Sequence, residues 1–279
     1  MLLDCHMHTP FCGHARGEPE AYVRAAAEQG LDLITFTCHV PLDPERFGGP
    51  HIRMPRERLP EYVERVREAA ELARSLNLEV LLGIEAEVYF EEEPMLEMDQ
   101  TLQAVAFDFV LGSLHHHCPG YSRMFVEKEL FEDDSRTQRY FEDLIRGVYS
   151  NRYDSIAHPD VIRDYGGLNR FAPSEFEPLI RRFLQALLDT DTCMEINTSG
   201  LIKNSFEVHP HPLILDWAAE MGVSLTMGSD AHSPDQVAQF FPLVLNLLRS
   251  RGFTELNYYR KRIRQTIPLP SWNLETDPA

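Results

Sequence analysis

Histidines and carboxylates gather in this sequence where short apolar segments end. The segment Leu2–Cys5 is followed by His6 and His8 in the pattern His-x-His, and His14 comes shortly after. Residues of the same kind follow five later apolar segments: His39, Glu85, His115, His116, His117, His158, Asp230 and His232. Imidazole and carboxylate groups suit Zn, Mn or Fe, and a bridging carboxylate can hold two such ions about 3.5–4 Å apart, the separation used in phosphoryl chemistry. The pattern therefore predicts a polynuclear metal site.

The recurrence of these residues carries more weight than any one of them, because a single histidine at a strand end is more often structural than a ligand. Side chains at i and i+2 of an extended chain project to the same side. Three pairs have this spacing: His6 with His8, Glu85 with Glu87, and Asp230 with His232. Within the run 115–117, alternation would put the first and third histidines on one face and His116 on the other.

Three further histidines lie in proline-rich stretches. They are His51, His209 and His211. For these residues a role on the surface or in a substrate loop is favoured over metal ligation.

Apolar segments alternate with helical patterns along the chain. The predicted strands are Leu2–Cys5, Leu33–Cys38, Glu79–Ile84, Phe107–Leu114, Ser155–Ala157, Cys193–Asn197 and Ser224–Met227. The predicted helices are Glu20–Gln29, Pro55–Leu76, Thr137–Tyr149, Pro173–Asp189, Pro212–Met221 and Pro234–Arg249. Such alternation predicts a parallel sheet, and seven or eight strand–helix units usually close into a barrel; an open doubly wound sheet is the alternative. Because parallel strands end at one rim, a barrel would bring the histidines and carboxylates together.

Length and composition fit one domain over residues 1–279 with a loose polar tail at 271–279. The 26 Lys and Arg against 44 Asp and Glu give a net charge of −18, which predicts no nucleic-acid partner. The start does not resemble a signal peptide, and no apolar run approaches the ~18–20 residues of a membrane span, so no membrane partner is expected. The oligomeric state does not follow from the sequence.

The chain has five scattered cysteines without a Cys-x-x-Cys pair. They are Cys5, Cys12, Cys38, Cys118 and Cys193. Their odd number and spacing indicate a reducing compartment and hence a cytoplasmic location. We interpret them as small buried hydrophobic residues rather than as ligands.

Eight segments, in order along the chain, resemble the polymerase-and-histidinol-phosphatase (PHP) superfamily, and within it the histidinol-phosphate phosphatases. The segments are Asp4–Thr9, Phe11–Ala15, Thr37–His39, Gly83–Glu85, Asp108–His115, Ala157–Arg163, Glu195–Gly200 and Gly228–His232. As an ordered set they are specific for the superfamily and less specific for the substrate.

The resemblance implies a distorted seven-stranded (β/α)7, TIM-like barrel that holds two to three divalent metal ions (Zn, Mn or Fe). Carried over residue by residue, the first ion takes His6, His8, Glu85 and Asp230. The second ion shares Glu85 and takes His115 and His158. The third ion takes His14, His39 and His232. All nine positions hold a competent ligand in this sequence.

The resemblance also implies residues for the substrate. Arg163 matches an arginine that such phosphatases use to hold the phosphate; an ion pair with Asp160 or Asp164 is the alternative. Asn197 ends the sixth predicted strand and is expected to hydrogen-bond the substrate. Relatives commonly read Ser-Gly-Leu-Arg-Lys where this chain reads Ser-Gly-Leu-Ile-Lys, ending at Lys203. Lysine supplies charge there but lacks the bidentate fork of arginine.

The implied reaction is hydrolysis of a small phosphorylated substrate, L-histidinol phosphate, in histidine biosynthesis, by attack of a hydroxide that bridges the metal ions. Arg163 would hold the phosphate, and Asp230 or a nearby histidine such as His232 would protonate the leaving alkoxide. One alternative is a PHP phosphoesterase acting on nucleotides, nucleic-acid ends or phosphotyrosine; another is a non-catalytic metal-binding module. Residues 118–134 are long enough to form a lid.

Overall fold

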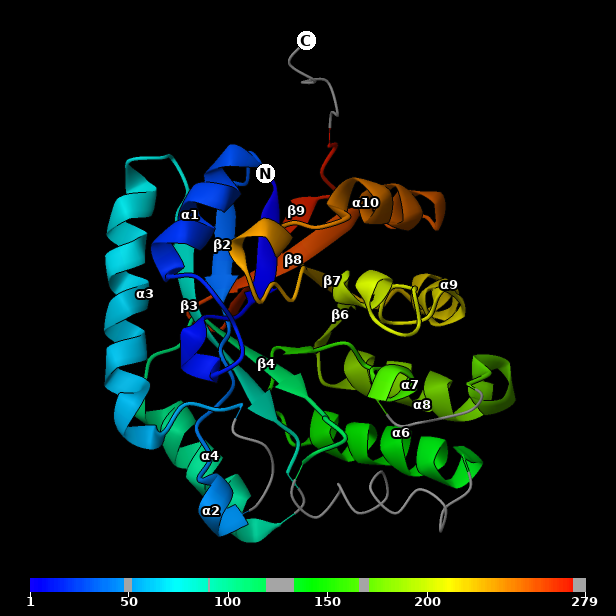
Figure 1. Cartoon of the computed structure of the whole chain (residues 1–279). Coiled ribbons are helices and arrows are strands. Elements are labelled where there is room, and N and C mark those ends of the chain that lie inside the picture. Colours follow the sequence, from blue (N-terminus) through cyan, green and yellow to red (C-terminus); the bar gives the residue numbers. More distant parts are fainter. Residues whose placement is uncertain (48–51, 90, 119–132, 166–170, 273–279) are drawn as a thin grey trace.

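The computed structural model describes residues 1–47, 52–89, 91–118, 133–165 and 171–272. Seven parallel strands form one sheet in sequence order. They are β1 Leu3–Met7, β2 Leu33–Phe36, β3 Glu79–Glu87, β4 Phe109–Ser113, β5 Ser155–Ile156, β6 Cys193–Asn197 and β7 Leu225–Gly228. The chain just past β7 closes the sheet against β1, because Met7 bridges Ala231 and His8 N–H donates to Ala231 O. The predicted distorted seven-stranded (β/α)7 barrel is confirmed (Figure 1).

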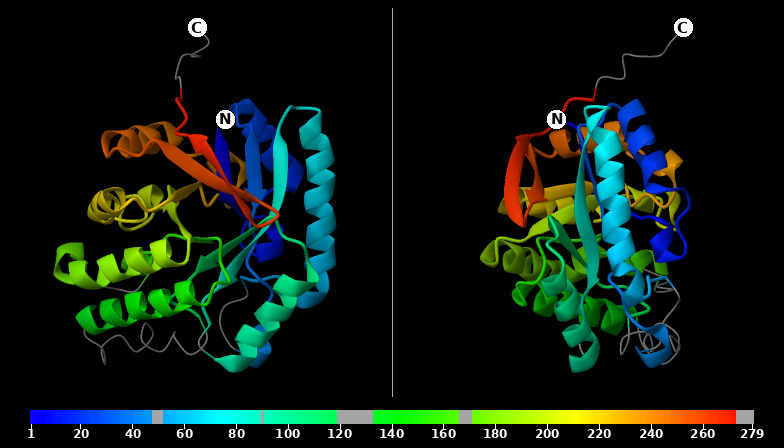
Figure 2. Two further views of the ribbon diagram at one scale, coloured as in Figure 1. Left: turned by 180° about the vertical axis from the view of Figure 1, so that it is seen from behind. Right: turned by 90° about the vertical axis from the view of Figure 1, so that its left-hand side faces the viewer.

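Helices connect the strands and pack around the outside of the sheet (Figures 1 and 2). They are α1 Pro19–Glu28, α2 Pro44–Phe47, α3 Leu59–Arg74, α4 Glu92–Ala104, α6 Asp133–Tyr149, α7 Ile162–Tyr165, α8 Glu177–Asp189, α9 Pro212–Met221 and α10 Phe241–Ser250. The apolar stripe of α3, with Tyr62, Val63 and Val66, is buried in the main core, as its periodicity predicts. Across the described ranges, no helix combines the length and apolar character needed to cross a membrane.

A hairpin of β8 (Glu255–Arg260) and β9 (Ile263–Pro268) lies across the other end of the barrel and was not predicted (Figure 2). Lys261 and Arg262 form its turn with φ of 53° and 62°, so the usual Asn or Gly signal is missing. Arg262 N–H donates to Asp108 O and Lys261 N–H donates to Asp108 Oδ1, which anchors the turn to the barrel. The hairpin closes an apolar cluster made of Leu3, Cys5, Leu33, Leu81, Phe109, Leu111, Ala157, Cys193, Tyr258 and Tyr259.

Other predicted elements agree to different degrees. The bounds of β6 and α9 are as predicted. The single helix predicted over 234–249 is wrong: a 3-10 turn, Pro234–Gln236, precedes α10, because Ala238 and Phe240 between them adopt φ of 54° and 61°. Helix α4 was not predicted. All five cysteines are free and buried, as interpreted. Residues 119–132 of the predicted lid and 273–279 of the predicted tail lie outside the described residues.

An irregularity in β1 decides where its side chains point. Between Asp4 and Met7, three residue steps along β1 match two along β2. The extra residue is a β-bulge, and side-chain alternation is reversed beyond it. Cys5 therefore belongs to the apolar cluster under the hairpin, while the next residue, His6, has its ring among the histidines at the opposite rim.

Candidate metal centre

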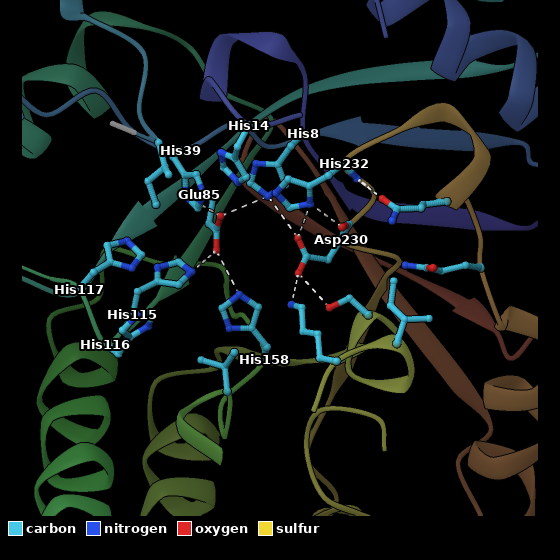
Figure 3. Close-up of a pocket in the computed structure, with 17 residues that line it drawn as sticks. His8, His14, His39, Glu85, His115, His116, His117, His158, Asp230 and His232 are labelled. Carbon is cyan, nitrogen blue, oxygen red and sulfur yellow. Dashed lines mark hydrogen bonds and ion pairs between the residues drawn. The ribbon is translucent and has the colours of Figure 1, made fainter. Parts of the chain in front are cut away.

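The Glu85 carboxylate lies at the centre of the histidines at the C-terminal rim (Figure 3). Its Oε2 is 2.8 Å from His39 Nδ1 and 3.4 Å from His8 Nε2. Its Oε1 is 3.3 Å from His158 Nε2 and 3.6 Å from His115 Nε2. His6 Nε2 is also 3.7 Å from Oε2. The two carboxylate oxygens therefore face different sets of imidazoles, which is the arrangement expected of a carboxylate that bridges two ions.

The described residues leave both Glu85 oxygens without a well-formed hydrogen bond, although both atoms are buried. His39 Nδ1 is close to Oε2 but also lacks hydrogen-bond geometry. A buried polar atom without a hydrogen-bond partner raises the free energy of the fold, so these atoms indicate that a further group binds here. Lone pairs that converge without hydrogen bonds are satisfied by a cation, and the residues therefore fit the divalent ions that the resemblance implies.

A second group of ligand atoms lies beside Glu85 at the closure of the barrel. His6 Nε2 is 3.0 Å from His8 Nε2. Asp230 Oδ1 is 3.5 Å from the first of these nitrogens and 3.3 Å from the second. These three atoms are close enough to one another to hold one ion. Together with Glu85 they are the residues of the first predicted ligand set.

A third group consists of imidazole rings that lie around His8. The ring centroid of His8 is 4.2 Å from that of His232 and 4.6 Å from that of His39, and the rings of His14 and His232 are 4.5 Å apart. His14 Nδ1 donates to a backbone carbonyl at 2.9 Å, which leaves Nε2 as its ligand atom. The third predicted set is therefore brought together, and all nine predicted ligands lie at one rim. His39 sits between this group and Glu85, so the three sets are less separate than predicted.

Burial sets most of the charge states in this site. It lowers the pKa of His8, and it lowers the pKa of His39 well below the usual value. It also lowers the pKa of His232 to about 4. Burial alone would raise the pKa of Glu85, but the neighbouring histidines outweigh it and hold that pKa well below its usual range. At His6 and His115 the neighbouring carboxylates outweigh burial and raise the pKa, so these two imidazoles must release a proton to bind a metal. The other three imidazoles and the ionised carboxylate are already in the protonation states that bind metals.

Glu87 holds His115 from behind. Its Oε1 accepts the His115 backbone N–H at 2.9 Å, and its Oε2 is 3.0 Å from His115 Nδ1. Ser113 Oγ is 3.2 Å from the same Nδ1 but donates its own proton to a backbone carbonyl, so Nδ1 faces two acceptors and carries the proton. Arg53 donates to Glu87 Oε2 in turn. His115 therefore presents the lone pair of Nε2 toward Glu85, the tautomer that a ligand needs.

A cavity of about 590 Å3 opens above these residues. Its walls include Ile52, Val161 and Ile202, together with the amides of Gln236 and Gln239, none of which was predicted from the sequence. All three histidines of the run 115–117 line the cavity. The chain turns there rather than staying extended, so the alternation that would put the middle residue on the opposite face does not apply.

The predicted substrate residues differ in where they lie. Lys203 lines the cavity, and its Nζ donates to Asp230 Oδ2 at 3.0 Å. Arg163 does not line it: its side chain is 5% exposed, its Nε is 3.0 Å from Asp160 Oδ2, and its Nη1 donates to Glu207 Oε2 at 2.7 Å. The alternative of an ion pair with Asp160 thus describes the position of Arg163.

Asn197 is also away from the cavity. It is fully buried; its Nδ2 donates to Glu195 Oε2 at 2.9 Å, and its Oδ1 accepts from Ser199 Oγ at 2.7 Å. His209 is equally buried, with its two ring nitrogens each 2.7 Å from a carboxylate oxygen of Asp160 or Asp164. Neither side chain is placed to contact substrate. His211 accepts a backbone N–H at the start of α9, and His51 lies outside the described residues.

The fold and the rim site together define a (β/α) barrel protein with groups of residues that could hold metal ions. Comparison with known families assigns the chain to one of them: the family model of the PHP domain matches residues 4–199. The probable histidinol-phosphatase of Deinococcus radiodurans is 30% identical over 94% of this chain and 98% of its own length. The chain therefore belongs to the PHP family.

Other relatives agree with this assignment. The histidinol-phosphatase of Bacillus subtilis is 26% identical over 87% of this chain and 97% of its own length. Among solved structures, the histidinol phosphate phosphatase of Lactococcus lactis, crystallised with zinc, L-histidinol and phosphate, superimposes with a TM-score of 0.80. The match covers 95% of this chain and 98% of that protein at 22% identity, so it supports the fold.

Proposed function

We propose that residues 1–279 form a single metal-dependent phosphomonoesterase that hydrolyses L-histidinol phosphate to L-histidinol and phosphate. The observation that carries the proposal is the Glu85 carboxylate, whose two oxygens face imidazoles that follow four different strands. The relatives suggest the substrate. Two of them are named as histidinol-phosphatases, and this chain aligns with nearly their whole length. The net charge of −18 disfavours a nucleic-acid substrate.

Two to three divalent ions, Zn, Mn or Fe, would be held by the nine residues predicted as ligands. These are His6, His8, His14, His39, Glu85, His115, His158, Asp230 and His232. When bound, such ions lower the pKa of water toward neutrality and offset the charge of a phosphate.

We assign Lys203 to the phosphate. Among the described residues that line the cavity, it is the one with a Lys or Arg side chain. Its Nζ lies beside Asp230 Oδ2, so its charge is at the edge of the ligand cluster, where phosphate oxygens would approach. Arg163 is assigned a supporting role, because it holds Asp160, two residues after His158, instead of facing the cavity.

Asp230 is better suited to binding an ion than to protonating the leaving alkoxide. Its Oδ1 faces His6 and His8, and its Oδ2 is 3.0 Å from both Ser199 Oγ and Lys203 Nζ. Burial would raise the pKa of Asp230, but the Lys203 ammonium and nearby histidines outweigh it and hold that pKa well below its usual value. An acid that is ionised at neutral pH is a ligand rather than a proton donor.

The test is phosphate release by the purified, metal-loaded protein from a panel of phosphomonoesters. The panel contains L-histidinol phosphate, mononucleotides, a phosphorylated oligonucleotide end and phosphotyrosine. We expect kcat/KM for L-histidinol phosphate to exceed that of each other substrate by at least about 100-fold, since a site built around one substrate leaves polar groups unpaired with the others. A preference for any other member, or no release from the metal-loaded protein, would contradict the proposal.

A further inference from the structure

The Glu195 carboxylate on β6 contacts two of the proposed ligands from behind. Its Oε1 is 2.7 Å from His6 Nδ1, and its Oε2 accepts the backbone N–H of His158 at 2.9 Å. Glu195 is 1% exposed and does not line the cavity. It can therefore act on the ligands but cannot touch a substrate bound in the cavity.

A glycine in the intervening strand permits this contact. β7 lies between β6 and the closing strand β1, so Glu195 must reach across β7 to meet His6. A Cβ atom built on Gly228 of β7 would lie 2.4 Å from His6 Cβ and 2.5 Å from Glu195 Oε1. Both distances are too short for real contacts, so any side chain at Gly228 would separate the imidazole from the carboxylate.

Glu195 also supports the backbone that presents His158. Strand alternation directs Ala157, not His158, into the barrel, where Ala157 joins the apolar cluster. His158 adopts φ of 23°, in the region that residues with a Cβ rarely occupy. This turn delivers the imidazole to the rim. The hydrogen bond from the His158 N–H to the Glu195 carboxylate holds the backbone where this turn begins.

A polar chain continues from Glu195 to the third side of the site. Asn197 Nδ2 donates to Glu195 Oε2, and Asn197 Oδ1 accepts from the backbone N–H of Ser199 at 3.0 Å and from its Oγ at 2.7 Å. Ser199 Oγ is also 3.0 Å from Asp230 Oδ2. Asn197 is therefore a link between two carboxylates, which accounts for its position away from the cavity.

We propose that Glu195 is a positioning residue that fixes His6 and His158 together and so sets the geometry of the metal site. Because Glu195 accepts from His6 Nδ1, it selects the tautomer whose Nε2 lone pair faces His8 and Asp230. Its negative charge also favours cations nearby, so position and charge act in the same direction. The inference rests on the proposed metal-binding role of the two histidines and is independent of which phosphomonoester is the substrate.

Glu195→Gln tests the proposal, because glutamine keeps the size and removes the charge. Its amide has one acceptor oxygen, so it cannot accept from both His6 Nδ1 and the His158 N–H. We expect the dissociation constant of the weakest retained ion, measured by chelator competition with elemental analysis, to rise about 10–100-fold. Glu79→Gln is the matched control: Glu79 begins β3 at the opposite end of the barrel and pairs with Arg260, and its variant should hold ions like the unmodified protein.

Two further measurements separate positioning from folding. The metal-free Glu195→Gln protein should remain folded at 25 °C, with a melting temperature within about 5 °C of the metal-free unmodified protein. In 15N NMR spectra of the metal-free proteins, recorded at a pH high enough for His6 to be neutral, the His6 ring should be protonated at Nδ1 in the unmodified protein and should lose this preference in the variant. Unchanged ion affinity, or a metal-free variant that is unfolded, would overturn the proposal. Normal ion affinity in the unmodified protein without histidinol-phosphate hydrolysis would instead contradict the proposed function alone.

Discussion

At the hairpin end of the barrel, Leu81 of β3 and Leu111 of β4 pack in an apolar cluster. Four residues further along the chain from each, Glu85 in β3 and His115 just past β4 face each other across the metal site. The two ends share strands, alternation and near-complete burial. They differ in what the inward side chains are, and therefore in what burial does to the free energy of folding.

Burial of the apolar cluster stabilises the fold, at about 25 cal/mol for each Å2 removed from water. Burial of the Glu85 carboxylate by itself would do the opposite in the metal-free protein, and the neighbouring histidines are needed to offset it. Bound ions would recover this cost through mass action. The comparison teaches that substitutions at the rim should change metal binding and activity, and that substitutions at the hairpin end should change stability.

The largest effect is expected for Glu85→Gln. It removes the charge that faces imidazoles on both sides of the carboxylate, so activity should fall by at least about 1,000-fold, or about 4 kcal/mol in the barrier. At least two ions should be lost in elemental analysis while circular dichroism shows a folded protein. Glu79→Gln makes the same change at the other end of the same strand and should keep activity within about twofold. Full activity and metal content in Glu85→Gln would show that the rim carboxylate is not needed for metal binding, which would contradict the comparison of the two ends.

The next effect distinguishes the ends within β4. Leu111→Ala leaves a cavity in the apolar cluster and should lower the free energy of unfolding by about 2–5 kcal/mol in urea denaturation, with metal content unchanged in the folded protein. His115→Ala, just past the same strand, should lower metal content and leave the metal-free protein within about 1 kcal/mol of the original. If Leu111→Ala lowered metal content and His115→Ala lowered stability instead, the hairpin end would not be the part that stabilises the fold and the rim would not be the part that binds metal.

A smaller effect separates two cations near the rim. Lys203→Met should lower kcat/KM about 10–100-fold, mainly through KM, because it removes the charge assigned to the phosphate. Arg163→Met should act on stability instead, since it leaves the buried Asp160 with one charged partner fewer, at a cost of about 3 kcal/mol. Steady-state kinetics and urea denaturation on both variants give the comparison. If only Arg163→Met lowered kcat/KM, Arg163 rather than Lys203 would be the residue that binds the phosphate.

The smallest effect is expected at the outside of the hairpin. Ile263 begins β9 and is 64% exposed, so Ile263→Ser should change the free energy of unfolding by less than about 0.5 kcal/mol and should not affect activity. A large loss of stability would mean that the hairpin contributes through its outer face as well as through its residues Tyr258 and Tyr259, which belong to the apolar cluster.

Much of the site follows from the sequence because its ligands lie at strand ends. The spacing of His6 with His8 and of Asp230 with His232 is visible without a structure, and a parallel barrel brings such pairs together. The role of Glu195 had a weak signal, since it precedes Asn197 at i+2 on one strand face. Its contact with His6 depends on the bulge in β1, and no residue in that segment predicts a bulge.

Other features depend on tertiary contacts that no local pattern encodes. The direction of Arg163 is set by Glu207 and a neighbouring backbone carbonyl more than forty residues away in the chain. Arg53 comes from a loop without a motif and meets Glu87 only in the folded protein. The β8–β9 hairpin carries charged residues in its turn, so neither turn chemistry nor an apolar run indicated it.

The most direct test of the polynuclear site is the number of ions that the protein binds. Elemental analysis should be made on protein purified without chelators, before and after incubation with Mn or Zn and removal of excess metal. Nine converging ligands exceed the four to six that one such ion takes, so we predict two to three ions per chain. A content of one ion or fewer, not raised by incubation with either metal, would contradict the account.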